Sequence, residues 1–259
     1  MKFHLIAGAR PNFLKISSII NAIVKSKHNI NYKIIHTGQH FDKNLSEVFF
    51  NQLNIPKPDI NLNCGGGTSI EQISKIMISY EDYIKNDIPD YTIVVGDVNS
   101  TVACSIVAKS YQVKVVHVEA GIRSFDISMP EEINRILTDS ITDFAFVTSE
   151  NAKKNLIYSG FNKQNIFFVG NTMVDTLLSN INRFRKPQLF DCNKLELNKY
   201  FVLTLHRPSN VDYELKLNEF LNYFDKNLFN YKIVFPIHPR TKKNLNNKLI
   251  FKNIIFCEH

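Results

Sequence analysis

Short apolar segments rich in β-branched residues alternate with segments of helical periodicity along most of the chain. Nearly continuous hydrophobicity is typical of strands that are buried on both faces of a parallel sheet. Before residue 186 the pattern predicts strands at 3–8, 32–38, 91–97, 113–121, 144–149 and 165–171. Because helical segments separate these strands, we expect a doubly wound parallel sheet of the α/β class.

Two of the intervening segments share one apolar rhythm. Each set follows the spacing i, i+3, i+4, i+7 behind a proline: Ile16, Ile19, Ile20 and Ile23 after Pro11, and Ile133, Ile136, Leu137 and Ser140 after Pro130. Proline suits the first position of a helix, and this spacing is that of an amphipathic helix whose apolar stripe faces a core. Both segments are therefore predicted to be helices.

A polar stretch divides the chain. Residues 186–199, which include Pro187, are predicted to link an N-terminal domain (1–185) to a C-terminal domain (200–259). In the second domain the alternation restarts, with strands at 201–206, 231–238 and 253–259 and a helix near 213–228. A parallel sheet of three strands without a further helix leaves one apolar face poorly covered. We therefore expect the second domain to be incomplete.

Composition narrows the classes of function. The chain has 259 residues, of which 44% are hydrophobic and 21% charged, as in ordinary globular proteins. The net charge of +7 is scattered rather than gathered into a basic stripe, which favours a small anionic ligand over nucleic acid. Four widely spaced cysteines predict no disulfide framework, and the apolar run at the start is too short for a signal peptide or membrane span. A cytoplasmic protein without a membrane partner is expected.

Ligands bind beyond the carboxyl ends of strands in open parallel sheets. The first strand runs into Gly8-Ala9-Arg10-Pro11, where free backbone N–H groups, with Arg10 and Lys15, suit a phosphate. A surface Arg and Lys flanking an ordinary turn is the alternative. Gln39 and His40 follow the second strand at the same edge, although a lone histidine is more often structural.

Acidic residues follow the next two strands. Asp97 and Glu119 end adjacent strands, and Glu131 shares a helix face with Arg135, while Glu132 points about 100° away. Glu131 alone could simply stabilise the first helical turn. Three carboxylates in one pocket cannot all ionise freely, so we expect one with a raised pKa, which provides an acid and a base together.

Cations complete this predicted site. His206 and Arg207 follow the first strand of the second domain, and together with Arg10 and Lys15 they could hold a diphosphate. The acids could instead bind a metal, but divalent sites for phosphates usually contain a closer acidic pair, and these cations already offset phosphate charge. No metal is expected.

At this point the chain resembles the non-hydrolysing UDP-N-acetylglucosamine 2-epimerases, from residue 3 to its last residue. The matching motifs are Gly8–Pro11, Thr37–His40, Gly96–Thr101, His117–Ser124, Met129–Arg135, Gly170–Asn171, His206–Arg207 and Pro236–Pro239. The pair HVEAG and PEExNR, in this order with a short loop between them, is highly specific. It also argues against a glycosyltransferase of the same fold.

The resemblance implies a glycosyltransferase-B-like fold, with two Rossmann-like domains and a UDP-sugar as substrate. It implies epimerisation at C2 of a UDP-N-acetylated hexosamine by elimination and re-addition of UDP, without a cofactor, and it suggests a homodimer. The implied acid/base residues are Asp97, Glu119 and Glu131. The implied substrate-binding residues are Arg10, Lys15, Gln39, His40, Arg135, His206, Arg207 and His238.

The chain departs from the family pattern in two ways. Ala9, Asn12, Val98 and Pro208-Ser209 stand where other residues are usual, which bears on rate or substrate. Ser124-Phe125-Asp126 and Met129 resemble the branch that uses acidic or diacetamido UDP-sugars. Family members also continue for roughly another hundred residues, as expected if the second domain is incomplete. Activity is therefore expected to be weak or lost, and a non-catalytic UDP-sugar-binding fragment or half of a split enzyme is the alternative.

Overall fold

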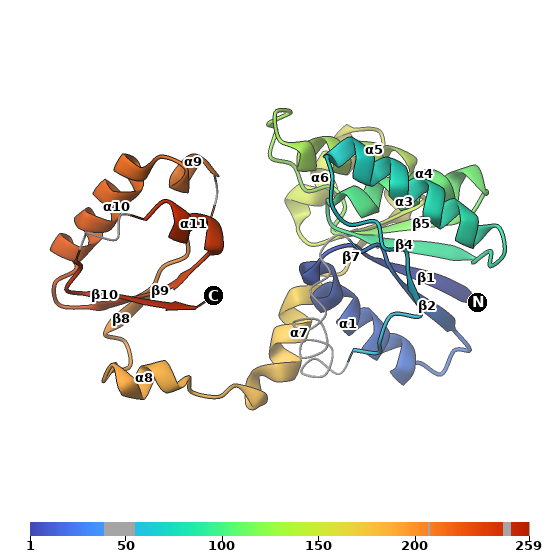
Figure 1. Ribbon diagram of the computed structural model, residues 1–259. Helices are drawn as coiled ribbons and strands as arrows, with labels where there is room; N and C mark the ends of the chain where they lie inside the picture. Colours follow the sequence, from blue (N-terminus) through green and yellow to red (C-terminus); the bar gives the residue numbers. More distant parts are fainter. Residues whose placement is uncertain (39–54, 207, 246–249, 259) are drawn as a thin grey trace. The chain divides into compact units, whose positions relative to one another are not determined.

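The computed structural model describes residues 1–38, 55–206, 208–245 and 250–258 (Figure 1). The chain divides into two compact units, Met1–Arg183 and Phe184–His259. The sequence places the boundary two residues later, at 185, and its linker at 186–199 contains a short helix, α8 (Gln188–Cys192).

The first unit is built on a parallel sheet with strand order β3-β2-β1-β4-β5-β6-β7. Its strands are β1 (Lys2–Ala7), β2 (Asn31–His36), β3 (Ile60–Asn61), β4 (Tyr91–Val95), β5 (Lys114–Val118), β6 (Phe144–Val147) and β7 (Ile166–Phe168). The six predicted strands are confirmed, and each ends one to three residues earlier than predicted. The additional strand, β3, has only two residues, which is too short to produce a periodic signal.

Helices cover both faces of this sheet. They are α1 (Arg10–Lys25), α3 (Ser69–Ile84), α4 (Asn99–Ser110), α5 (Pro130–Ile141), α6 (Glu150–Tyr158) and α7 (Thr172–Asn180), with 3₁₀ turns at Lys163–Asn165 and Ile181–Arg183. In Figure 1, α1 and α7 lie on one face, and α3, α4 and α5 lie on the other. None of the described helices is long and apolar enough to cross a membrane.

Alternate residues of each central strand enter different cores, as the two-residue period requires. Leu5 packs towards α1 with Phe13 and Ile16, whereas its neighbour Ile6 packs towards α3 and α4. The same alternation separates Ile34 from Ile35, Ile93 from Val94, and Val116 from Val115. The sheet is thus buried on both faces, which explains the continuous hydrophobicity of its strands.

Helix α5 has the reverse of the usual amphipathic orientation, with its polar side buried. Its buried side chains are polar: Glu132, Asn134, Thr138 and Asp139. Its apolar side chains are outside, where Ile133, Ile136 and Leu137 are 44%, 39% and 47% exposed. The predicted helix is confirmed, but the expectation that its apolar stripe faces the core is wrong, because the polar side bonds to groups at the ends of β4 and β5.

The second unit holds a parallel sheet with strand order β10-β9-β8. Its elements are β8 (Tyr200–Val202), β9 (Lys232–Ile237), β10 (Ile254–Glu258), α9 (Pro208–Val211), α10 (Glu214–Asn227) and α11 (Pro239–Lys243), with α8 before them. Leu217 and Leu221 of α10 pack on Ile233, Phe235 and Ile254 of the sheet. The three predicted strands and the helix near 213–228 are confirmed.

Candidate active site

The turn between β1 and α1 uses its own side chain to satisfy backbone donors. Asn12 Oδ1 accepts hydrogen bonds from the N–H groups of Gly8 (3.2 Å) and Ala9 (2.8 Å), and Asn12 Nδ2 donates to the Val95 carbonyl (3.0 Å). The expectation that the Gly8 and Ala9 N–H groups are free to bind a phosphate is therefore wrong. Arg10 begins α1, and its side chain lies outside the described part of the structure.

Lys15 of α1 forms an ion pair with Glu119, which directly follows β5. The Nζ–Oε2 distance is 2.5 Å, and the two side chains are 13% and 12% exposed. Glu119 has a positive φ of 71° and donates its N–H to the Phe146 carbonyl (3.0 Å). Because a non-glycine residue adopts this conformation only at a cost, the fold holds Glu119 at a strained position, as is typical of functional sites.

Gly96 brings this ion pair against the turn that carries Asp97. Its φ is +72°, and a Cβ atom on it would lie 3.2 Å from Lys15 Nζ and 3.6 Å from Glu119 Oε2. A side chain at position 96 would therefore crowd both charged groups. The glycine allows the Glu119 carboxylate to lie against the residue before Asp97, so two of the predicted acids meet at one edge of the sheet.

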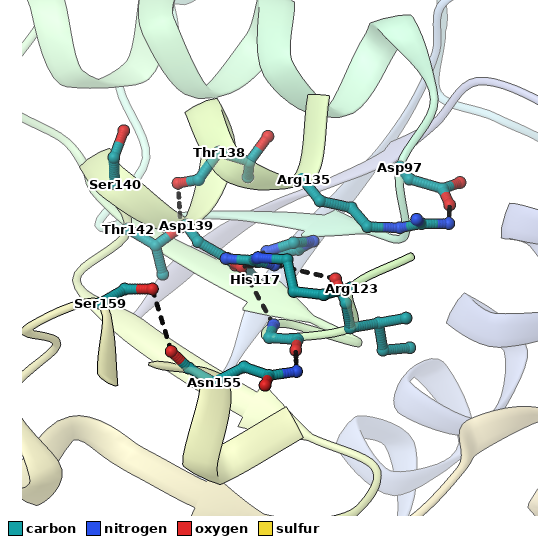
Figure 2. Close-up of polar contacts among 12 residues, drawn as sticks. Asp97, His117, Arg123, Arg135, Thr138, Asp139, Ser140, Thr142, Asn155 and Ser159 are labelled. Carbon is teal, nitrogen blue, oxygen red and sulfur yellow. Dashed lines mark hydrogen bonds and ion pairs between the residues drawn. The ribbon is translucent and has the colours of Figure 1, made fainter. Parts of the chain in front are cut away.

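Asp97 pairs with Arg135 of α5, and Figure 2 shows the two side chains pointing toward each other. Arg135 also bonds to Glu132 across one helical turn (3.0 Å). Burial alone would lower the pKa of Arg135, but the carboxylates of Asp97 and Glu132 outweigh it and raise this pKa. Asn134 adds a bond from its amide to the Asp97 carbonyl (2.9 Å), so α5 holds Asp97 by two side chains.

Glu132 is the carboxylate that the sequence interpretation set aside. It is 1% exposed and accepts bonds from Ser124 N (2.9 Å), Ser124 Oγ (3.0 Å) and Phe125 N (3.1 Å) as well as from Arg135. Burial raises the pKa of Glu132, but these hydrogen bonds together lower it below its ordinary value. No local signal marks this role, because its partners Ser124 and Phe125 lie in a loop of irregular structure.

Glu131, the third predicted acid, lies in the first turn of α5 and is exposed. Among the described residues its side chain has no hydrogen bond or ion pair. It precedes Arg135 by four positions, so both lie on the same side of the helix. The structure thus places Asp97 and Glu119 against cations and leaves Glu131 open at the start of α5.

Figure 2 also labels a buried histidine–aspartate pair, His117 and Asp139. His117 of β5 bonds through Nε2 to the Gly96 carbonyl (2.8 Å) and through Nδ1 to Asp139 Oδ1 (2.7 Å). Asp139 Oδ2 accepts from Gly121 N (3.1 Å) and from Arg123 (2.7 Å). Burial raises the pKa of Asp139, but His117 and Arg123 outweigh it and lower this pKa. Asp139 was missed, although its place four residues after Arg135 on α5 was an available signal.

Gly121 closes the turn after Glu119 against helix α6. Its φ is +77°, and a Cβ atom on it would lie 2.3 Å from the Ala152 carbonyl oxygen. The Asn155 side chain of α6 donates to the Gly121 carbonyl (2.9 Å). The turn that carries Glu119 is therefore bonded to α5 through Asp139 and to α6 through Asn155.

The remaining predicted residues belong either to the undescribed part of the chain or to the second unit. Gln39, His40 and Arg207 lie outside the described residues. His206 and His238 belong to the second unit, where their ring centroids are 6.1 Å apart. His238 is the N-cap residue of α11 and accepts the N–H of Arg240 through Nδ1 (3.2 Å).

The arrangement is suited to proton transfer next to an anion. Asp97 and Glu119 are carboxylates at neighbouring strand ends, and Arg135 and Lys15 stand beside them as cations. Carboxylates can exchange protons with a substrate, while the cations can stabilise negative charge that develops on a leaving group.

Comparison with known proteins identifies the family. A family profile described as UDP-N-acetylglucosamine 2-epimerase matches residues 22–259. The chain is 42% identical to the UDP-N-acetylglucosamine 2-epimerase of Methanocaldococcus jannaschii, over 98% of this chain and 70% of the relative. It is 39% identical to the UDP-2,3-diacetamido-2,3-dideoxy-D-glucuronate 2-epimerase of Pseudomonas aeruginosa, over 93% of this chain and 68% of the relative.

A solved structure agrees with both sequence relatives. The M. jannaschii UDP-GlcNAc 2-epimerase in complex with UDP-GlcNAc and UDP aligns with a TM-score of 0.85 at 42% identity, over the whole of this chain and 73% of that one. The expected glycosyltransferase-B-like fold class is confirmed by this match and by the two parallel sheets. On this evidence the chain is a member of the UDP-N-acetylglucosamine 2-epimerase family.

Proposed function

We propose that this chain epimerises UDP-N-acetylglucosamine at C2, giving UDP-N-acetylmannosamine. One carboxylate removes the C2 proton while the C1–O bond to UDP breaks, which leaves a 2-acetamidoglucal and UDP. UDP then adds back to C1, and a proton is delivered to the opposite face of C2. Protons and electrons balance without an oxidant or reductant, so this reaction needs no redox cofactor.

Asp97, Glu119 and Glu131 are proposed as the acid/base groups. The C2 proton is only weakly acidic, so departure of a well-neutralised diphosphate must provide much of the activation. Lys15 and Arg135 are proposed to contribute this positive charge together with Arg10 and Arg207. Gln39, His40, His206 and His238 are proposed to bind the substrate. The observation that carries the proposal is the meeting of the Lys15–Glu119 pair with the Gly96–Asp97 turn in a chain of this family.

The reaction is tested by incubating the chain with UDP-N-acetylglucosamine in deuterated water and following C2 by NMR. We expect deuterium at C2 and the appearance of the manno epimer. Glu119→Gln keeps the size of the side chain but cannot accept the proton as a carboxylate does, and is expected to slow exchange about 100-fold or more. Absence of label in the wild-type chain, with UDP binding seen by calorimetry, would favour the binding-only alternative.

The P. aeruginosa relative makes the sugar itself a question of specificity. That protein is a 2-epimerase of a diacetamido glucuronate, and it is almost as similar to this chain as the N-acetylglucosamine enzyme. We propose UDP-N-acetylglucosamine as the substrate because the M. jannaschii relative, an enzyme of that name, is 42% identical to this chain. Parallel exchange assays with both UDP-sugars decide the matter, since the preferred substrate gives the higher kcat/KM.

We also propose that two copies of the chain associate through the outside of α5. The outer α5 patch consists of Phe125, Ile127, Ile133, Ile136 and Leu137, all of them exposed and none of them charged. Because the chain carries a net charge of +7, two copies repel each other at most approaches, whereas a neutral patch can meet itself across a two-fold axis. Phe125, Ile127 and Ile136 of the patch also line a cavity of about 640 Å³. Tyr158, which is 95% exposed, lines it too, so a protruding side chain lies beside a hollow that could receive its counterpart from a second copy.

Analytical ultracentrifugation tests this association. Leu137→Asp places a charge in the patch and is expected to shift the wild-type dimer to monomer. Ile78→Asp is the matched control, since Ile78 is 62% exposed on α3, outside the patch, and its change is expected to leave the dimer intact. A wild-type chain that remains monomeric at about 100 μM would contradict the proposal, because a specific dimer should form well below that concentration.

A cytoplasmic location is proposed as well. All four cysteines are free thiols, with Cys64 and Cys104 buried in the first unit. Free thiols persist in reducing compartments. Fractionation of cells that express the chain tests this, with the protein expected in the cytoplasmic fraction.

A further inference from the structure

We propose that His117 and Asp139 form a positioning pair that holds the Asp97 and Glu119 turns in their working geometry. The inference rests on the proposed epimerase function, since it concerns the acids of that reaction. Neither side chain reaches the open site, because His117 is 0% and Asp139 is 4% exposed. They act through the backbone on either side of the two acids.

The first contact fixes the residue before Asp97. Gly96 donates its N–H to the Val118 carbonyl (3.0 Å), and its own carbonyl accepts from His117 Nε2 (2.8 Å). A carbonyl oxygen only accepts, so Nε2 must carry a hydrogen. Gly96, the residue before Asp97, is thus held through both its N–H and its carbonyl by β5, the strand that leads into Glu119.

The second contact fixes the other ring nitrogen. Asp139 accepts the Gly121 N–H and an Arg123 N–H through Oδ2, and His117 and Arg123 hold the pKa of its carboxyl below the ordinary value. Its Oδ1 lies 2.7 Å from His117 Nδ1. The ring is thus held between the Gly96 carbonyl and the Asp139 carboxylate, with one partner at each ring nitrogen.

The pair joins three segments that carry the proposed acids. His117 binds the end of β4 at Gly96, and Asp139 binds the turn after Glu119 at Gly121. Asp139 also lies one turn after Arg135, whose guanidinium holds Asp97. Loss of the Asp139 carboxylate should therefore move both acids, while the substrate-binding groups elsewhere keep their places.

The experiment compares Asp139→Asn with Asp143→Asn. Asp143, which directly precedes β6, is a matched control that accepts the Val115 N–H near the start of β5 (2.7 Å) and a bond from Lys109 Nζ (2.9 Å). In Asp139→Asn we expect kcat for C2 deuterium exchange to fall about 100-fold, as a misplacement near 1 Å does. KM should stay within about threefold, because substrate binding is retained. Asp143→Asn should keep the wild-type kcat.

Nitrogen-15 NMR of the histidine rings gives a readout that does not depend on turnover. The His117 Nδ1 signal is expected to shift in Asp139→Asn, which lacks the carboxylate beside this nitrogen, and to stay in place in Asp143→Asn. A His117 Nδ1 signal that is unchanged in Asp139→Asn overturns the proposal, and so does an equal loss of kcat in both variants. If the wild-type chain shows no exchange, the epimerase function fails. The pair is then judged by the ring spectrum and by whether Asp139→Asn, but not Asp143→Asn, shifts the amide signals of Asp97 and Glu119.

Discussion

Helices α1 and α5 have the same apolar rhythm and opposite orientations. Both open with a proline at the active edge of the sheet, and both repeat apolar residues at i, i+3 and i+4. In α1 the stripe is inside, with Ile16 and Ile20 only 0% and 3% exposed. In α5 the equivalent Ile133 and Leu137 are 44% and 47% exposed, while Glu132 and Asp139 are buried.

The difference shows that amphipathic periodicity predicts a helix without fixing which side the protein keeps inside. The side that is buried depends on what it meets. α1 meets an apolar sheet face and contributes methyl groups, whereas α5 meets the polar ends of β4 and β5 and contributes hydrogen-bonding groups. Because α5 buries its polar side, it contributes little hydrophobic stabilisation to the fold. Its buried side forms part of the candidate active site, and its exposed side forms an apolar patch.

The largest expected effect comes from breaking the polar inside of α5. Glu132→Ala leaves Arg135 and the Ser124 and Phe125 N–H groups without their buried carboxylate, and should lower the free energy of unfolding by about 4 kcal/mol. Glu131→Ala, one residue earlier and exposed, should change it by less than about 0.5 kcal/mol. Urea denaturation measures both, and equal costs would contradict the inverted orientation.

A second prediction compares equivalent positions of the two apolar stripes. Ile20→Ala opens a cavity in the core and should cost about 3 kcal/mol. Leu137→Ala removes an exposed side chain and should cost less than about 0.5 kcal/mol in the monomer. Both variants are denatured at low micromolar protein concentration, so that the costs refer to the monomer. Similar costs at both positions would mean that α5 buries its apolar stripe after all.

The smallest expected effect is a pH dependence of the free energy of unfolding that arises from Glu132 of α5. Because the pKa of Glu132 is lowered in the folded state, its stabilisation is fully present above the ordinary glutamate pKa and is lost as pH falls through the lowered value. The difference in free energy of unfolding between wild type and Glu132→Gln should therefore shrink as the pH falls from about 6 to about 3, the range in which carboxyl groups titrate. Urea titrations at several pH values measure this difference.

Acid also acts elsewhere in the molecule, and the comparison removes that contribution. Burial, with Lys2 and Lys33, lowers the pKa of His4 to about 3, so the folded state resists a proton that the unfolded state accepts. Wild type and Glu132→Gln share this histidine, and it cancels in their difference. An advantage that stays constant with pH would show that Glu132 does not titrate differently in the folded state.

The sequence predicts the layout of the fold well and the environment of the site less well. Six strands of the first sheet follow from continuous hydrophobicity, and Asp97 and Glu119 follow from their places at strand ends. These signals are local, since they depend on residues next to each other along the chain. The Lys15–Glu119 pair joins residues 104 positions apart, and no periodicity announces such a contact.

Errors of prediction occurred where a polar side chain satisfies the backbone. Asn12 takes the N–H groups of Gly8 and Ala9 that were expected to be free. Glu132 and Asp139 likewise accept hydrogen bonds from N–H groups of loops, and for this reason the polar side of α5 is the buried side. A charged residue within an amphipathic helix is normally predicted to be exposed to solvent. Only the three-dimensional structure shows that N–H groups of loops lie where they can donate to it.

Gly121 sets a limit on how far this site can be altered by substitution. Gly160 also has a positive φ, yet a Cβ atom there meets nothing within 4 Å, so Asn or Asp could replace it at modest cost. At Gly121 the Ala152 carbonyl lies where any side chain would begin, and even alanine must push α6 away. In a saturation library, position 121 should accept glycine alone, because only a hydrogen atom fits where a Cβ would lie 2.3 Å from the Ala152 carbonyl oxygen.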